Sequence, residues 1–196
     1  MYPGDRNASG TLMKTIKLLI IVALIGVSGI ALFIYSGIFN IAADNPHWPV
    51  TFKILTTVRD RSVEARSGTV TPPDLSIESR ITLGAGNYDA MCTGCHLRPG
   101  VKESELSRGL YPKPPPWRDL GKVDPRQAFW AIKHGIKMSG MPAWGKSMSD
   151  EHIWNIVAFV QKLPNLTPHR YHELVASSSG HKHGSDGAEP LFHSEM

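Results

Sequence analysis

The sequence predicts an all-α protein in which a single membrane-spanning helix precedes a small domain of helices and loops. Three observations lead to this fold class. Residues 18–43 form a run of 26 residues without a charge. Residues 75–91, 124–134 and 149–162 place apolar side chains at helical spacing. Gly and Pro are common between these stretches, and strands do not alternate with helices as they would in a parallel sheet.

The uncharged run is long enough to cross a membrane. A bilayer core of about 30 Å needs a helix of about 20 apolar residues. A cleaved signal peptide has a shorter apolar region of about 7–15 residues and small residues at its cleavage site. Cleavage after Ala43 would place the bulky Ile41 at one of those positions. We therefore expect an uncleaved anchor at residues 16–40.

The charges that flank the run predict its orientation. Arg6, Lys14 and Lys17 precede it, whereas only Lys53 is basic among the 15 residues after Phe39. Lys and Arg are retained on the cytoplasmic side of a membrane. Residues 1–15 are therefore expected in the cytoplasm of a bacterium, and the chain after the anchor on the periplasmic side of the inner membrane.

The only two cysteines lie in a Cys-x-x-Cys-His motif, formed by Cys92, Cys95 and His96. A disulfide between them would close a very small loop and stabilise little. A zinc site needs four ligands, and this motif offers three. A redox dithiol of the thioredoxin type would sit in a strand–helix–strand pattern. The motif is instead typical of covalent haem c attachment, with both thiols bonded to the porphyrin and His96 as the proximal iron ligand.

The residues before the motif strengthen this interpretation. Gly84, Tyr88 and Cys92 follow one another at steps of four and share one helical face. Gly84-x-x-x-Tyr88-x-x-x-Cys92-x-x-Cys95-His96 resembles the N-terminal helix of the small monohaem c-type cytochromes. In that family the glycine lets a C-terminal helix cross closely, and the aromatic residue packs at the crossing.

The resemblance implies a small cytochrome c fold, with one haem c, over a domain that we expect at residues 75–166. A C-terminal helix is predicted to begin after Ser149 and to end at Pro164. In the family this helix presents an aliphatic residue and, three positions later, an aromatic residue to the first helix. Ile156 and Phe159 fit those two places.

The sixth iron ligand is expected on the loop after a third helix at residues 124–134. Met138 and Met141 both lie on that loop. Family members carry the distal methionine in a Gly-Met-Pro sequence, which residues 140–142 match, so the resemblance favours Met141. Met138 remains an alternative, and His134 is a weaker one because it should lie on the preceding helix.

Three further residues are candidates for contacts around the haem. The resemblance implies that the carbonyl of Pro99 accepts a hydrogen bond from the His96 ring, which would orient the ligand. Residues 109–121 are too rich in proline for a helix and are expected to wrap the haem edge. Within them, Trp117 or Arg118 could bond a haem propionate, or could simply cap the loop surface.

These features together predict an electron carrier and not an enzyme. With His96 and Met141 as axial ligands no position is open for substrate, and His/Met ligation raises the reduction potential. The haem would cycle between Fe(III) and Fe(II) and exchange electrons with an oxidase, reductase or dehydrogenase of a respiratory chain, either as a separate carrier or as a subunit of such a complex. Residues 77–168 hold 12 Lys or Arg and 8 Asp or Glu, a net charge of +4 that would favour an acidic protein surface, and nucleic acid is not an expected partner.

Two alternatives come from other functional classes. The haem could serve a sensor or a catalytic subunit whose sixth iron site is open. The chain could also handle copper through its histidine-rich end, residues 167–196, which is otherwise expected to be a flexible tail. The histidines of that segment are His169, His172, His181, His183 and His193.

The segment between anchor and haem domain, residues 41–74, is expected to contain a helix and a linker. Val50, Ile54, Leu55 and Val58 recur at helical spacing within residues 46–67. This helix could lie on the membrane surface or pack on the haem domain, and the apolar residues are too few to decide between the two.

Overall fold

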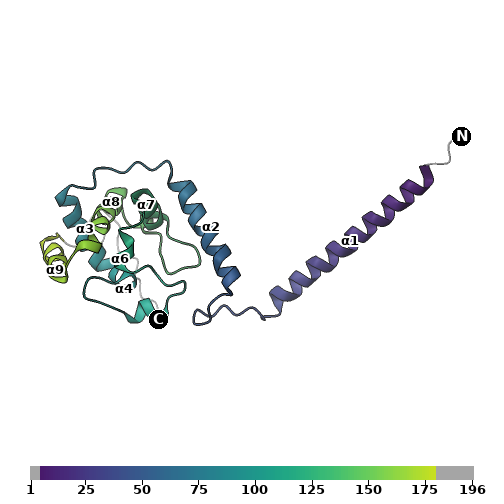
Figure 1. Ribbon diagram of the computed structural model, residues 1–196, viewed down its shortest axis with the longest axis horizontal. Coiled ribbons are helices and arrows are strands. Elements are labelled where there is room, and N and C mark those ends of the chain that lie inside the picture. Colours follow the sequence, from purple (N-terminus) through teal and green to yellow (C-terminus); the bar gives the residue numbers. More distant parts are fainter. Residues whose placement is uncertain (1–4, 180–196) are drawn as a thin grey trace, which may run out of the picture. The chain divides into compact units, whose positions relative to one another are not determined.

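Residues 5–179 are described by the computed structural model, and helices joined by loops account for all regular structure among them (Figure 1). The chain divides into two units, residues 1–45 and residues 46–196, which are described separately. The first unit holds α1 (Asp5–Tyr35). The second unit holds α2 (Pro49–Ser67), α3 (Glu78–Met91), α4 (Thr93–His96), α5 (Glu105–Gly109), α6 (Trp117–Leu120), α7 (Pro125–His134), α8 (Asp150–Lys162) and α9 (Pro168–Ser177), with the 3-10 turns η1 (Trp144–Lys146) and η2 (Leu163–Asn165).

Helix α1 contains one candidate for the expected membrane span. Its residues Gly10–Tyr35 are long enough and apolar enough to cross a bilayer. The helix ends at Tyr35, five residues before the predicted boundary, because Gly37 adopts a left-handed φ of 68°. The Ser36 hydroxyl closes the end by donating to the carbonyl of Phe33 at 2.8 Å.

The second unit is organised around the crossing of α3 and α8. A Cβ atom on Gly84 would lie 1.9 Å from the carbonyl oxygen of Asn155 and 2.8 Å from Cβ of Phe159. Only glycine allows the two backbones to approach so closely. The rings of Tyr88 and Phe159 are 5.5 Å apart beside the crossing, and both side chains are buried, as is Ile156. The expected role of Gly84 is therefore confirmed.

Local capping signals explain where these helices begin. The Ser149 side chain accepts the N–H of His152 at the start of α8. Helix α3 starts at Glu78, three residues later than the domain boundary predicted from the sequence. Asp74 causes the delay, since its carboxylate accepts from both the N–H and the hydroxyl of Ser76 and forms a turn instead.

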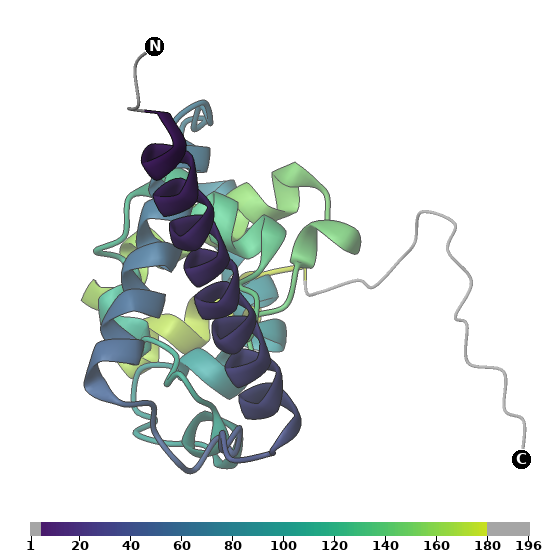
Figure 2. The same cartoon turned by 90° about the vertical axis from the view of Figure 1, so that its right-hand side faces the viewer.

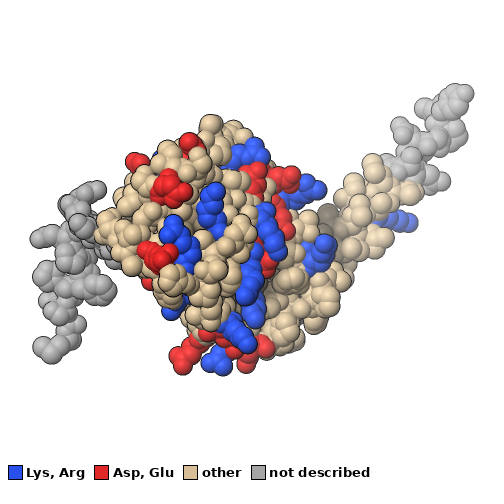
Figure 3. All heavy atoms as spheres, turned by 60° about the vertical axis from the view of Figure 1, so that its left-hand side comes forward, with Lys and Arg blue, Asp and Glu red and all other residues tan. Residues whose placement is uncertain are grey.

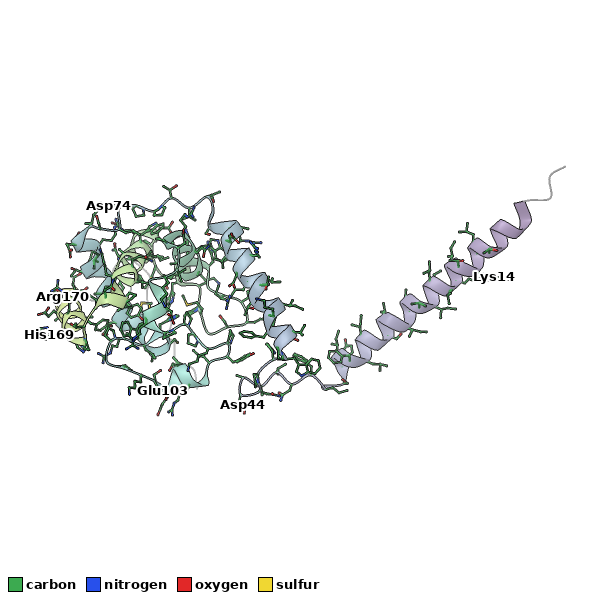
Figure 4. The ribbon with its side chains drawn as sticks, in the orientation of Figure 1. Lys14, Asp44, Asp74, Glu103, His169 and Arg170 are labelled. Atoms are coloured by element: carbon green, nitrogen blue, oxygen red, sulfur yellow. The ribbon has the colours of Figure 1, made fainter. Side chains whose placement is uncertain are left out.

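The expectation of a flexible tail from residue 167 is wrong for its first part. Helix α9 covers residues Pro168–Ser177 and buries Tyr171 and Leu174 in the core. The Tyr171 hydroxyl donates to the Asp89 carboxylate on α3 at 2.7 Å. His169 and His172 belong to this packed helix (Figure 4 shows His169 on it). His181, His183 and His193 lie outside the described residues.

The segment after the anchor forms a helix as predicted. Helix α2 runs along one side of the second unit, next to α7, in both cartoon views (Figures 1 and 2). It therefore packs on the domain that follows it. The side chains of the predicted apolar stripe nevertheless remain exposed.

Candidate haem-binding site

A cavity of about 780 Å³ lies inside the second unit, within the range of about 300–1,000 Å³ usual for cofactor pockets. Its walls are mainly apolar side chains of α7 and α8 and the proline-rich loop before α6. The cysteines and the histidine of the motif line it together with Met141. The main apolar members are Met91, Leu110, Leu120, Ala128, Ala131, Ile132, Ile136, Ile156 and Val160, joined by Pro112, Pro114, Pro115 and Pro142.

The end of α3 and the turn α4 bring the motif to the cavity. The N–H of Cys92 bonds the carbonyl of Tyr88 at 2.9 Å, and the N–H of His96 bonds the carbonyl of Cys92 at 2.8 Å. Leu97 then leaves the turn with a left-handed φ of 65°. The buried Tyr88 hydroxyl donates to the Leu97 carbonyl at 2.8 Å and holds this strained residue in place.

Both cysteines are free thiols, and their surroundings disfavour ionisation. Burial raises the pKa of Cys92 to about 12, with a smaller contribution from the nearby Cys95. Burial also raises the pKa of Cys95. Thiolates are the reactive and metal-binding form of cysteine. A raised pKa therefore disfavours the thiolate form of both cysteines, and no cluster of three or more His, Cys, Asp or Glu side chains that could hold a metal ion occurs among the described residues.

His96 presents one ring nitrogen to the protein. Its Nδ1 lies 2.8 Å from the carbonyl oxygen of Pro115, and a carbonyl can only accept, so Nδ1 carries the proton. Burial lowers the pKa of His96, although this hydrogen bond works against the shift. The ring is therefore held neutral, with Nε2 left as a lone-pair donor, which is the form that ligates iron.

The partner of His96 corrects the expectation for Pro99. The carbonyl that orients the ring belongs to Pro115 and not to Pro99, which is buried elsewhere on the turn. Three consecutive prolines, residues 114–116, have no N–H groups and cannot enter a helix, so their carbonyls stay available. The spacing in sequence could not reveal this contact, because 19 residues separate Pro115 from His96.

Met141 reaches the cavity on a short loop after α7. The N–H of Ile136 bonds the Met141 carbonyl at 3.1 Å and closes the loop. Inside it the Ser139 hydroxyl donates to the Ile136 carbonyl at 2.7 Å and accepts the N–H of Met141 at 3.2 Å. Gly135 starts the loop with a φ of 66°, and a Cβ there would lie 2.8 Å from the Met141 carbonyl oxygen.

The other two candidates for a distal ligand point away from the cavity. Met138 is 97% exposed and does not line it. His134 is the last residue of α7 and is exposed, with its ring 4.9 Å from that of Trp130. Of the three candidates, only Met141 is brought together with Cys92 and His96.

Trp117 and Arg118 do not line the cavity. Trp117 is 5% exposed and belongs to the core at the start of the one-turn helix α6, which sequence reasoning had treated as loop. The guanidinium carbon of Arg118 lies 4.4 Å from the centroid of the Trp117 ring. The structure therefore assigns both residues a packing role, and a bond from either one to a haem propionate stays a prediction.

Four further residues that line the cavity come from helix α2 and were not predicted from the sequence. Arg59, Asp60, Val63 and Glu64 all face the cavity. They form two adjacent pairs at a spacing of four, a pattern that places them on one face of a helix. This spacing is visible in the sequence, but it does not say what the face contacts.

The comparisons with known proteins agree with this geometry. A family model described as cytochrome C oxidase, cbb3-type, subunit III, matches residues 79–160, from the first turn of α3 to α8. No curated protein and no solved structure matches the chain. Residues 79–160 are therefore a c-type cytochrome domain, which supports a role as a haem electron carrier. Helices α1, α2 and α9 lie outside the match.

Proposed function

We propose that this chain, which carries a c-type cytochrome domain, is a membrane-tethered electron carrier with a single haem c and His/Met axial ligation. The observation that carries the proposal is the shared cavity: Cys92, Cys95, His96 and Met141 all line it. Covalent attachment through the two thiols would keep the haem in a small domain whose cavity opens at the surface.

The chain's own side chains would perform the remaining tasks. Pro115 fixes the ring of His96 so that Nε2 stays free to ligate. The Met141 loop holds a thioether at the other wall, and apolar side chains exclude water between them. Bound haem supplies one-electron chemistry, with a potential raised by His/Met ligation and by burial.

The membrane tether and its orientation rest on α1. Its apolar span of 26 residues, with Lys14 and Lys17 near its beginning, supports an anchor with a cytoplasmic N-terminus and a periplasmic haem domain. The length of the apolar span supports the anchor, and the positions of the basic residues support its orientation. Fractionation tests the anchor, and protease digestion of spheroplasts tests the orientation.

Redox proteins of a respiratory chain are the proposed partners. The family description names a subunit of an oxidase, which supports a donor or acceptor of that kind or a place within such a complex. Lys113, Lys137 and Lys146 are exposed in the segments around the cavity. Acidic and basic side chains nevertheless lie next to one another on the face shown in Figure 3, and Lys133 pairs with Asp150 at 2.7 Å. We therefore infer that charge steers partners only modestly.

The test is haem attachment in the full chain, produced where haem c is assembled. Haem should remain with the polypeptide on a denaturing gel and should be lost from the Cys92→Ala, Cys95→Ala double variant. Thr93→Ala, between the two cysteines, is the matched control and should keep it. Haem that extracts freely from the unmutated chain into acidified organic solvent would overturn the proposal.

Fractionation tests the tether in the same preparations. The full chain should stay with membranes after a carbonate wash, and a chain that replaces residues 1–43 with a cleavable signal should be soluble. Protease added to spheroplasts should digest the haem domain. A native N-terminus found near Asp44 would show that α1 is removed and would contradict the tether.

A further inference from the structure

The inner face of helix α2 contacts the haem domain, and these contacts fix how the helix is rotated about its own axis. Arg59 and Val63 line the cavity, and Ser67, at the end of the helix, is 3% exposed. The ring of Phe52, one turn from the start, is 6.4 Å from that of Tyr111. The side of α2 that faces away from the domain is therefore defined.

The beginning of α2 is also tied to the loop that orients the iron ligand. The N–H of His47 bonds the Tyr111 hydroxyl at 3.0 Å, and the two rings are 5.2 Å apart in an edge-on arrangement. Tyr111 precedes the proline run that contains Pro115. Because both its ends are held, α2 belongs to the haem domain although it lies outside the family match.

The outer face of α2 is apolar over its first three turns. Val50, Ile54 and Val58 recur at a spacing of four and are 70%, 57% and 62% exposed. Leu55 lies beside this stripe, and Trp48, the residue before the helix, is 81% exposed. A contiguous apolar face of this kind on a folded domain marks an interaction surface.

The position of α2 in the chain identifies what covers the stripe. Residues 36–48 alone separate the end of the apolar span from the start of α2. Thirteen residues reach at most about 45 Å when fully extended, so anchoring by α1 keeps the start of the stripe within that distance of the bilayer surface. Trp favours the membrane–water interface, and Trp48 stands at the start of the stripe.

The charges of α2 point to the same surface. The two acidic residues of the helix, Asp60 and Glu64, pair with Arg59 and Arg61. Lys53 and Arg66, both exposed, remain as an excess of two positive charges, which favours the anionic lipids of a bacterial membrane. An apolar face combined with basic residues is the composition of helices that lie in the lipid interface.

We propose that α2 lies in the lipid interface of the membrane that α1 spans, with the Val50–Ile54–Val58 stripe inserted at the boundary of headgroups and acyl chains. This rests on the tether proposed above. Helix α2 would then lie between the bilayer and the haem, because its opposite face lines the haem cavity. The membrane-facing wall would then be closed to redox partners, which must approach from other sides.

The test measures the surroundings of the stripe in the full chain. Ile54→Cys and Glu103→Cys are made separately and spin-labelled after haem attachment, when Cys92 and Cys95 are blocked. Glu103, which is exposed and lies away from α2 in Figure 4, is the matched control. Each protein is reconstituted in vesicles of zwitterionic and anionic phospholipid at no more than one chain per vesicle.

The Ile54 label should be severalfold less accessible to a water-soluble paramagnetic reagent than the Glu103 label, and more accessible to oxygen, which concentrates in lipid. Val58→Cys should repeat the result if the Ile54 variant fails to assemble. Equal accessibility of the stripe and control labels in a membrane-embedded chain would overturn the placement of α2 in the lipid interface and leave the tether unaffected.

Further controls distinguish lipid from a second copy of the chain as the group that covers the stripe. Protection that appears only when several chains share a vesicle would show that a second copy covers the stripe, and would overturn the proposal. The vesicles hold no other protein, so protection at high dilution can come only from lipid. Release of the unmutated full chain by carbonate would overturn the tether itself, and this proposal with it.

Discussion

His96 is held by contacts that span the second unit, whereas Met141 is held by a short loop that bonds mainly to itself. On the His96 side, the α3–α8 crossing fixes the helix that ends in the motif, and Pro115 reaches the ring from a different part of the chain. On the Met141 side, the hydrogen bonds run among Ile136, Ser139 and Met141. Two lining residues of one cavity thus depend on interactions of different range.

This difference separates retention of the haem from the state of its sixth ligand. Loss of a long-range contact on the His96 side should disturb the whole fold, since α3 and α8 form the core. Loss of a loop contact should change ligation and leave the fold intact. The alternative of an open sixth site therefore depends on the Met141 loop and not on the motif.

The largest expected effect is on the crossing. Gly84→Ala would place Cβ 1.9 Å from a backbone oxygen of α8, so the helices must separate. We expect the free energy of unfolding to fall by about 3 kcal/mol, at the upper end of overpacking effects. Denaturant unfolding followed by circular dichroism measures this.

Gly109→Ala is the matched control for the crossing. Gly109 ends α5, and a Cβ there would meet nothing within 4 Å. Its stability should stay close to that of the unmutated chain. Similar losses at Gly84 and Gly109 would contradict the claim that one helix crossing holds the His96 side.

The next effect is on the sixth ligand. Met141→Ala should open the iron to carbon monoxide and lower the reduction potential, because a thioether favours ferrous iron. Met138→Ala should change neither, since that side chain is 97% exposed. Reduced protein, with carbon monoxide binding followed by absorbance, gives the measurement.

Three other outcomes would revise the ligand assignment. A change at Met138 alone would reverse the two methionines and preserve the carrier role. A change only in His134→Ala would indicate bis-histidine ligation. Ready binding of carbon monoxide by the unmutated chain would favour the sensor or enzyme alternative.

The features that could be predicted from the sequence are those with local signals. The motif, the Gly84 spacing and the bounds of α7 and α8 each depend on residues within one or two helical turns. The structure confirms α7 and α8, and the close contact at Gly84 confirms the crossing.

The features that were missed depend on contacts between distant segments. Pro115 lies 19 residues from His96, and α9 is fixed by Tyr171 meeting Asp89 across 82 residues. The inner face of α2 could not be predicted because the apolar stripe is the helix's clearest sequence pattern, and it left open whether the helix meets the membrane surface or the haem domain. The face that contacts the domain is the mixed one with Arg59 and Val63. Exposure of that stripe reverses the usual rule for amphipathic helices in soluble domains.

A smaller effect is expected inside the Met141 loop. Ser139→Ala removes both a donor to Ile136 and an acceptor for Met141. The loop should be destabilised by about 1 kcal/mol, the usual net value of a hydrogen bond. Carbon monoxide should then replace Met141 faster, with global stability little changed. Ser147→Ala, which removes only a long contact of 3.4 Å, is the control, and equal rates in the two variants would contradict the role of Ser139.

An effect of similar size is expected at the N-terminus of α7, the helix that carries the loop. The Asp124 carboxylate accepts the N–H of Arg126 at 2.8 Å and pairs with its guanidinium at 3.0 Å. The hydrogen bond from the Arg126 side chain is the main cause of a lowered pKa at Asp124. Asp124→Ala should cost about 1 kcal/mol at neutral pH, as for other helix caps.

The pH dependence of this effect distinguishes the charge of Asp124 from its capping geometry. A carboxyl with a lowered folded-state pKa stabilises the fold above its ordinary value of 3.8, and this contribution is lost as the pH falls through the folded-state pKa. The difference between the unmutated chain and Asp124→Ala should therefore shrink below that pH. Asp124→Asn keeps a capping oxygen without a titrating charge, so its stability relative to Asp124→Ala should not depend on pH in this range. Denaturant midpoints at neutral and acid pH measure both differences, and a constant gap between Asp124 and Asp124→Ala would show that the charge contributes nothing to α7.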